Sequence, residues 1–244
     1  MEHQTISKLT QMNIKGMSQT YHDDLATGQL TAYTTAEYLA KLTDAEWESR
    51  QNRKITNLKR AANFRQKAHP LNIDYTIDRK LDKGVMQRLL GFNFLQQSEN
   101  IIFTGFTGTG KSYLAQAIGV SACERAYRTM YYPMSLLTDT VNAVKIQGNY
   151  PKWLKKIQRA DLLILDDFGL TSFDGSTRKA LIDIIDYRYS KHSIIIVSQI
   201  PVNKWHPLIG EDTIADAILD RIVHNAHRIE LKGESMRRKR KINS

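Results

Sequence analysis

An α/β fold with a parallel sheet is what the sequence predicts, and three observations support it. From about residue 100 onward, short apolar runs alternate with segments of helical periodicity, as in parallel sheets that helices cover on both faces. One run, residues 101–104, leads into a loop with the spacing Gly-x-x-x-x-Gly-Lys-Ser at residues 105–112. Another, residues 162–165, ends in the adjacent acids Asp166 and Asp167. Together these observations predict a fold that binds a nucleoside triphosphate.

The glycine-rich loop has the pattern of a P-loop, and its residue types suit phosphate binding. Glycines let consecutive backbone N–H groups curl around phosphate oxygens, and the start of the following helix adds unpaired donors. Lys111 supplies a cation for the β- and γ-phosphates, and Ser112 a hydroxyl for Mg²⁺. A chance glycine turn is the alternative, which the strand before and the helix after the loop disfavour. The predicted nucleotide-binding residues are Gly105, Phe106, Thr107, Gly108, Thr109, Gly110, Lys111, Ser112 and Tyr113.

The acidic pair supplies the second half of the predicted catalytic centre. A P-loop enzyme needs a carboxylate at the end of a neighbouring strand to hold Mg²⁺ through water, and Asp166 fits this role. Asp167 stands where a general base would orient the attacking water. An ordinary Asp-rich turn at the end of a strand is the alternative. It is less consistent with a P-loop at this distance upstream.

A polar side chain follows the predicted strand at residues 194–198. If this strand lies between the P-loop strand and the Asp166 strand, Gln199 or its neighbour Ser198 would face the γ-phosphate. In the alternative, both residues only begin the turn before Pro201. Gln199 is therefore a candidate sensor of the nucleotide.

Arg221 closes a predicted helix near residues 213–222. An arginine presented at such a point can reach a nucleotide that a neighbouring subunit holds. The alternative is half of a surface ion pair with Asp216 or Asp220. The sequence leaves both roles open, and Arg221 is the candidate residue for catalysis between subunits.

The alternation of elements defines the core region. We predict strands and helices in alternation, with strands at residues 101–104, 129–132, 162–165, 194–198 and 227–231, and helices at residues 111–125, 135–146, 153–158, 176–189 and 213–222. The helix at residues 153–158 is basic. Ahead of the first strand, apolar spacing predicts one further helix over residues 81–95, interrupted by Gly91.

Residues 1–66 predict a separate helical domain. Apolar residues recur at helical spacing over residues 9–21, and Gly28 then breaks the pattern. The stretch at residues 34–37 resembles a helix start with an acidic residue in the first turn. This start opens a long helix that we expect to reach Phe64.

The second half of that long helix is strongly basic. No acidic residue occurs from Ser49 to Ile73, and a solvated helix face more often mixes charges of both signs. We therefore predict contacts with DNA phosphates. A solvated basic face packed on the main domain is the alternative. The predicted contact residues are Arg50, Arg53, Lys54, Lys59 and Arg60.

Pro70 and the extended pattern after it predict a linker at residues 67–78. The predicted division is thus a helical domain at 1–66, the linker, and an ATPase core at 79–244 that ends in a basic tail.

Composition narrows the choice of partners. The net charge of +10 favours a polyanion, which is nucleic acid or less often a membrane surface. A basic soluble protein without such a partner is the alternative that composition alone leaves open. The sequence contains no run of eighteen apolar residues, so no membrane span is expected. No secretory signal is expected at the N-terminus. The single cysteine, Cys123, excludes an internal disulfide. These features predict a cytoplasmic protein with no membrane partner.

Taken in order, these motifs resemble the IstB family of transposition helper ATPases. That family belongs to the AAA+ group and is related to the DnaC and DnaI helicase loaders. The resemblance covers nearly the whole chain. It rests on the P-loop, on Leu162-Leu163-Ile164-Leu165-Asp166-Asp167-Phe168-Gly169, on Ser198-Gln199-Ile200-Pro201, on Asp220-Arg221-Ile222 and on the ending Gly233-Glu234-Ser235-Met236-Arg237-Arg238.

The resemblance implies an AAA+ core with strand order 5-1-4-3-2 and a small helical N-terminal domain. The usual AAA+ helical lid is not expected, because the chain ends soon after the fifth predicted strand. It also implies Mg²⁺-dependent ATP binding and hydrolysis, and self-assembly into a homo-oligomer on double-stranded DNA. The assembled protein would then deliver that DNA to a transposase encoded by the same insertion sequence.

Roles follow for the residues at the matched positions. The resemblance implies that Lys111 and Ser112 are Walker A, Asp166 and Asp167 Walker B, Gln199 sensor 1 and Arg221 the arginine finger. Many AAA+ proteins have glutamate as the second Walker B acid, so Asp167 provides a shorter base. Arg237 is a candidate substitute for sensor 2.

Two other functions compete with this interpretation. A helicase loader of the DnaC type has the same core motifs, and its N-terminal helices would bind a replicative helicase instead of DNA. The acid-free basic stretch, the two adjacent aspartates and the ending at residues 233–237 favour the transposition helper. A metabolic kinase would need an acceptor site for a small molecule, and no residues that build one are evident.

Overall fold

The computed structural model of the protein describes residues 2–236 and forms two compact units, Met1–Asn57 and Leu58–Ser244. The division falls inside one long helix, α3 (Thr35–Ala62). This helix confirms the predicted one, although it ends at Ala62 instead of Phe64.

The first unit is helical. Its first two helices, α1 (Glu2–Gln11) and α2 (Lys15–Thr27), replace the single helix that apolar spacing predicted over residues 9–21. That prediction was wrong because Asn13 takes a positive φ of 58°, which ends one helix and starts the next. A short 3₁₀ helix, η1 (Gln29–Ala32), leads to α3.

Reciprocal hydrogen bonds at the start of α3 explain why the helix begins where the sequence predicted. The Thr34 N–H donates to the Glu37 carboxylate, and the Glu37 N–H donates to the Thr34 hydroxyl. This arrangement is a capping box, which satisfies two donors that the first turn leaves unpaired.

In the same unit, the Gly16 N–H donates to the Glu46 carboxylate at 2.7 Å. A Cβ at Gly16 would collide with the α3 backbone at Ala45 and Glu46, so helix contact requires glycine here.

One parallel sheet organises the second unit. Its strands are β1 (Asn100–Gly105), β2 (Thr129–Pro133), β3 (Leu162–Asp166), β4 (Ser193–Ser198) and β5 (Ala226–Leu231). They lie in the order β2-β3-β4-β1-β5, which confirms the predicted order 5-1-4-3-2. Because β4 pairs with both β1 and β3, the carboxyl ends of these three strands meet at one edge.

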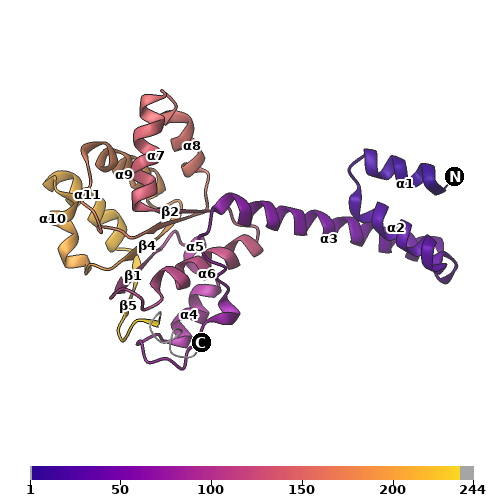
Figure 1. The fold of residues 1–244 in the computed structure, drawn as a ribbon, viewed down its shortest axis with the longest axis horizontal. Helices are drawn as coiled ribbons and strands as arrows, with labels where there is room; N and C mark the ends of the chain where they lie inside the picture. Colours follow the sequence, from indigo (N-terminus) through magenta and orange to yellow (C-terminus); the bar gives the residue numbers. More distant parts are fainter. Residues whose placement is uncertain (1, 237–244) are drawn as a thin grey trace. The chain divides into compact units, whose positions relative to one another are not determined.

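Helices cover both faces of this sheet (Figure 1). One face packs against α4 (Lys83–Leu90), α5 (Asn93–Gln96) and α6 (Lys111–Glu124). The other packs against α7 (Met134–Ile146), α8 (Tyr150–Gln158), α9 (Gly175–Arg188), α10 (Trp205–Ile209) and α11 (Asp212–Val223). Two short 3₁₀ helices, η2 (Pro70–Asn72) and η3 (Val202–Lys204), complete the described elements.

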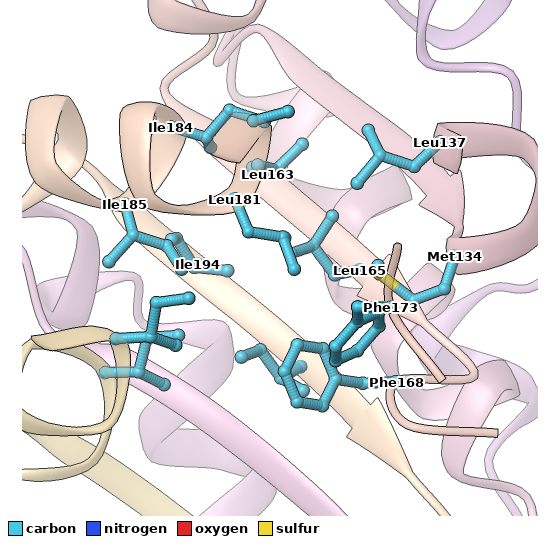
Figure 2. Packing of buried hydrophobic residues seen from close by; sticks show 14 of the residues in the cluster. Met134, Leu137, Leu163, Leu165, Phe168, Phe173, Leu181, Ile184, Ile185 and Ile194 are labelled. Carbon is cyan, nitrogen blue, oxygen red and sulfur yellow. The ribbon is translucent and has the colours of Figure 1, made fainter. Parts of the chain in front are cut away.

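Successive residues of the strands serve opposite faces, as the pleat of a strand requires. Ile101 and Phe103 pack on the α6 side, while Ile102 between them packs on the other side. Figure 2 shows the hydrophobic cluster on the face of the sheet away from α6, where Leu163 and Leu165 of β3 meet Leu181 and neighbouring residues of α9. The strands are buried on both sides, which explains their uninterrupted apolar sequences.

The single helix predicted over residues 81–95 is divided into α4 and α5. Phe92 separates them with a positive φ of 64°, and its ring is buried in the core. Burial of the ring therefore outweighs continuation of the helix.

Among residues 2–236, no helix is both long and apolar enough to cross a lipid bilayer.

Candidate nucleotide-binding site

A pocket of about 800 Å³ opens at the carboxyl ends of β1 and β4. Two sets of residues line it. The P-loop wall comes from the motifs that the sequence singled out, and comprises Thr107, Gly108, Gly110, Lys111, Ser112, Tyr113, Asp167, Ser198 and Gln199. The opposite wall comes from the segment ahead of α4 and from the end of the described chain, and includes Gln66, Asn72, Ile73, Asp74, Ile77, Arg79 and Met236.

The P-loop is held in its curved form by glycine. Gly110 has a φ of 93° and directly precedes α6, a conformation that a residue with a Cβ rarely adopts. The Lys111 ammonium lies inside the loop and donates to the carbonyl oxygens of Gly105 and Phe106, both at 2.7 Å. Burial lowers the pKa of Lys111, while Asp166 and Asp167 act in the opposite direction. The loop thus concentrates a cation and helix N–H groups where phosphates would bind.

Asp166 lies behind the loop at the last position of β3 and is 2% exposed. The Ser112 hydroxyl donates to its Oδ1 at 3.0 Å, and the Tyr131 hydroxyl donates to its Oδ2 at 2.7 Å. Burial raises the pKa of Asp166, and these hydrogen bonds act against that rise. The structure therefore brings together the two predicted metal ligands and adds Tyr131, a residue of β2 that the sequence analysis did not identify.

The oxygens of Ser112 and Asp166 are of the kind that Mg²⁺ requires. Mg²⁺ commonly takes one or two protein oxygens and completes its shell with phosphate oxygens and water. No cluster of three or more metal-binding side chains occurs in the described part of the chain. A site with one carboxylate and one hydroxyl beside a phosphate-binding loop consequently fits Mg²⁺ bound together with a nucleotide, and not a metal held by protein alone.

Asp167 lines the pocket from a strained turn. Its φ is 60°, which costs energy for a residue other than glycine. Its N–H donates to Oδ1 of Asp166 at 2.9 Å. The turn thus separates the two acids, with Asp166 buried in the sheet and Asp167 at the pocket surface.

Gln199 and Ser198 have different environments although both line the pocket. The Gln199 Oε1 accepts a hydrogen bond of 2.5 Å from the Thr107 hydroxyl of the P-loop. The Ser198 hydroxyl donates to the carbonyl of Phe168 and accepts from the N–H of Ile200. Ser198 therefore fixes the turn, and Gln199 is the residue connected to the phosphate-binding loop.

Arg221 is not among the residues that line this pocket. Its guanidinium pairs with Asp186 of α9 at 2.9 Å and donates to the carbonyl of Ala217. The sequence had offered Asp216 or Asp220 as the surface partner. Its side chain is 29% exposed, so Arg221 is partly accessible at the surface of the core unit.

Three of the five basic residues predicted to contact DNA are paired with acids. Arg50 and Arg53 both contact the Glu46 carboxylate, at 2.6 and 3.2 Å, and Lys59 contacts Glu124 at 2.8 Å. The premise of an unpaired stripe was therefore wrong. The other two, Lys54 and Arg60, are exposed and form none of the ion pairs found within residues 2–236.

The opposite wall is joined to the P-loop by buried polar side chains. Gln116 of α6 is fully buried, and its Oε1 accepts from the N–H groups of Arg65 and Gln66. Arg79 is 3% exposed and donates to the carbonyls of Thr109 and Asp74. The chain before α4, predicted as an extended linker, thus forms one side of the pocket. A single buried arginine in a polar stretch gave no sequence signal for this role.

The end of the described chain returns to the same place. The Met236 N–H donates to the carbonyl of Gly108 at 2.9 Å, and its sulfur accepts from Arg79 at 3.1 Å. A Cβ at Gly108 would collide with the side chain of Ser235. Met236, within the ending that resembled IstB, therefore lines the pocket. Arg237, the candidate for sensor 2, lies outside the described residues.

Comparison with known proteins shows the family to which the chain is similar. The family described as "IstB-like ATP binding protein" matches residues 7–244. The chain is 37% identical over 244 residues to "Putative insertion sequence ATP-binding protein y4pL" of Sinorhizobium fredii, with all of both chains covered. It is 31% identical to "Insertion sequence IS21 putative ATP-binding protein" of Pseudomonas aeruginosa, over 84% of this chain and 77% of that one.

Solved structures share the fold. The replication initiator DnaA bound to AMPPCP and single-stranded DNA aligns with a TM-score of 0.60 and 24% identity. That alignment covers 74% of this chain and about half, 56%, of DnaA. DnaI aligns with a TM-score of 0.56 and 18% identity, over 69% of this chain and 90% of that one. At these identities the likeness establishes the AAA+ fold alone.

Proposed function

Because this chain belongs to the IstB-like ATP-binding protein family, we propose that it is an ATPase that assists transposition of an insertion sequence. ATP-bound protomers would assemble on duplex target DNA and recruit the transposase of the same element, and hydrolysis would release the assembly. The observation that carries the ATPase assignment is the 3.0 Å contact between the Ser112 hydroxyl and Asp166. It supports the proposal because it joins the P-loop hydroxyl to the carboxylate at the end of β3, the two groups proposed to hold Mg²⁺.

Each residue of the P-loop wall has a proposed task. Lys111 would exchange its contacts with two loop carbonyls for the β- and γ-phosphates. Ser112 and Asp166 would hold Mg²⁺, which when bound neutralises charge on the phosphates. Asp167 would accept a proton from the attacking water at its carboxylate, and Gln199 would sense the γ-phosphate from its bond to Thr107.

Arg221 is proposed to act on the nucleotide of a neighbouring protomer. It lines no part of its own chain's nucleotide pocket, and its side chain is partly exposed. A docking subunit would have to replace the exposed partner Asp186, whose side chain is 63% exposed. Exposed ion pairs contribute little free energy, about 0–1 kcal/mol. Replacing Asp186 as the partner of Arg221 would therefore cost little free energy.

The insertion-sequence assignment rests on relatives. Those reported above are named as ATP-binding proteins of insertion sequences, and one matches the whole chain. The fold shared with DnaI does not by itself support a helicase loader, because its identity is 18%. Duplex DNA, the transposase and further copies of this chain are therefore the proposed partners.

Electron microscopy with 60–100 base-pair duplex DNA, of a length chosen roughly to span several protomers, tests the proposal. We expect nucleotide-dependent assemblies on DNA with ATP, and none with ADP or without nucleotide. A Lys111→Ala variant should form none in any condition. Protein that binds and hydrolyses ATP yet never assembles on DNA would contradict the transposition role while leaving the ATPase assignment intact.

A further inference from the structure

A second basic surface lies in the core unit, on helix α8. The helix packs on the sheet through Trp153 and Ile157, which are 8% and 0% exposed. Three cations of the helix and Arg159, the helical residue that caps its end, recur at positions i, i+3, i+4 and i+7, so they share one face. All four are exposed; they are Lys152, Lys155, Lys156 and Arg159.

These cations border a groove of about 1000 Å³ that we call the α8 groove. Arg128, just before β2, adds a fifth exposed cation to its lining. Its lining includes Thr129, where β2 begins, and Ala160, two residues before β3 begins at Leu162. The groove is thus near the amino ends of these strands, whereas the nucleotide pocket adjoins the carboxyl ends of the strands.

The charges of the α8 groove are not neutralised by the protein. No aspartate or glutamate is among the lining residues. None of the five cations forms an ion pair with an acid in the part of the chain that the structure describes. The nearby Asp161 carboxylate accepts from the backbone N–H of Arg128, and not from its guanidinium. By contrast, Arg50, Arg53 and Lys59 of α3 all have carboxylate partners.

We propose that the α8 groove binds the phosphate backbone of duplex DNA, which extends the function proposed above and rests on it. A helix rises about 1.5 Å per residue, so the four cations extend over about 10 Å. A duplex carries about one phosphate charge per 1.7 Å, or roughly six over that length. Several cations can therefore be neutralised at once by a single segment of duplex.

The character of the groove favours nucleic acid over an acidic protein segment. Protein interfaces derive most of their affinity from aromatic and apolar anchors that enter pockets. The large apolar residues beneath the groove already belong to the core, since Trp153 and Met130 are 8% and 9% exposed. The charged residues of the lining are all cations, and cations bind phosphates without reading sequence.

The experiment compares two triple variants with equal loss of charge. The groove variant is Lys152→Gln, Lys155→Gln and Lys156→Gln. Its control is Lys179→Gln, Lys191→Gln and Lys204→Gln, which removes three exposed lysines that line none of the pockets described above. Binding to a 30 base-pair duplex, a length of about three helical turns, is measured by fluorescence anisotropy in ATP from roughly 50 to 300 mM salt.

We expect the slope of log affinity against log salt to become shallower by about two to three units in the groove variant. Affinity at about 0.15 M salt should fall roughly 100-fold. The control should keep the wild-type slope. Both variants should bind a fluorescent ATP analogue like wild type, since the groove is at the other edge of the sheet.

Three results would overturn the proposal. The first is an equal slope for the groove variant and its control when wild type binds DNA. The second is a groove variant that keeps its DNA slope but loses binding to poly-L-glutamate, which would assign the groove to an acidic protein. The third is wild type that binds ATP but no duplex, and this result alone would also remove the proposed transposition role.

Discussion

The two walls of the nucleotide pocket are built in different ways. The P-loop wall comes from short motifs at strand ends, and it carries the charged groups Lys111 and Asp167. The opposite wall joins residues 66–79 to Met236, which is 157 positions away from Arg79 in the chain. The first wall holds groups that can act on phosphates. The second holds a buried arginine that bonds to backbone carbonyls, so its role is to shape the pocket.

This difference has a kinetic consequence. Groups that act on the reacting phosphate change kcat, whereas groups that only position the bound nucleotide change its affinity. Substitutions in the P-loop wall should therefore reduce turnover, and substitutions in the opposite wall should weaken binding. The predictions below test that separation.

The largest effect is expected for Asp167→Asn. The amide has the size of the acid but cannot accept a proton from water, and general base catalysis contributes about 10²- to 10⁴-fold. Hydrolysis in the presence of DNA should fall by that factor. Affinity for an ATP analogue should stay within about twofold, because Asp167 is at the pocket surface and removing it leaves no buried partner unpaired.

Steady-state phosphate release and equilibrium binding provide the two measurements. Asp139→Asn is the control, since Asp139 is an exposed acid of α7 outside the pocket. A variant at Asp167 that loses binding and turnover in proportion would remove the base assignment.

A smaller effect is expected for Tyr131→Phe, behind the P-loop wall. The substitution deletes only the hydroxyl that donates to Asp166 at 2.7 Å. Partners that orient a metal ligand typically contribute about 10- to 100-fold to metal affinity or activity. We expect the Mg²⁺ concentration for half-maximal hydrolysis to rise about tenfold, while nucleotide affinity measured without Mg²⁺ is unchanged.

Tyr150→Phe is a matched control, because the Tyr150 hydroxyl donates to Asp183 with the same 2.7 Å distance away from the pocket. Each variant loses one hydroxyl contact with a carboxylate, buried for Tyr131 and partly buried for Tyr150, and both should unfold at similar temperatures. An unchanged Mg²⁺ requirement in Tyr131→Phe would mean that the hydroxyl only stabilises the sheet.

The P-loop wall could be predicted from sequence because its signals are local. Apolar runs ending in glycines or aspartates identified β1 and β3 within a residue or two of their observed ends. The two walls differ here as well. The roles of Arg79, Gln116 and Tyr131 depend on contacts with residues 30, 51 and 35 positions away, respectively. A single sequence does not specify which distant segments will meet.

Charge was misjudged for the same reason. The stretch from Ser49 to Ile73 contains no acid, so its cations were predicted to be unpaired. Their partners are Glu46, one turn before the stretch, and Glu124, on α6. Helix α8 was noted only as basic, yet the cations of its outer face form no ion pair within residues 2–236. Whether a cation is free depends on the folded surface, not on the neighbouring sequence.

The opposite wall is tested by Arg79→Lys, for which the smallest effect is expected. Lysine keeps the charge but cannot reach the carbonyls of Asp74 and Thr109 together, as the guanidinium does. Loss of one net hydrogen bond, about 1 kcal/mol, should weaken ATP binding roughly fivefold. kcat at saturating ATP should change less than about twofold. Arg178→Lys is the control, because Arg178 also donates to two backbone carbonyls, those of Phe173 and Ile209, outside the pocket. If Arg79→Lys instead lowers kcat and leaves affinity intact, the arginine acts on the reacting phosphates, and the two walls do not divide binding from catalysis.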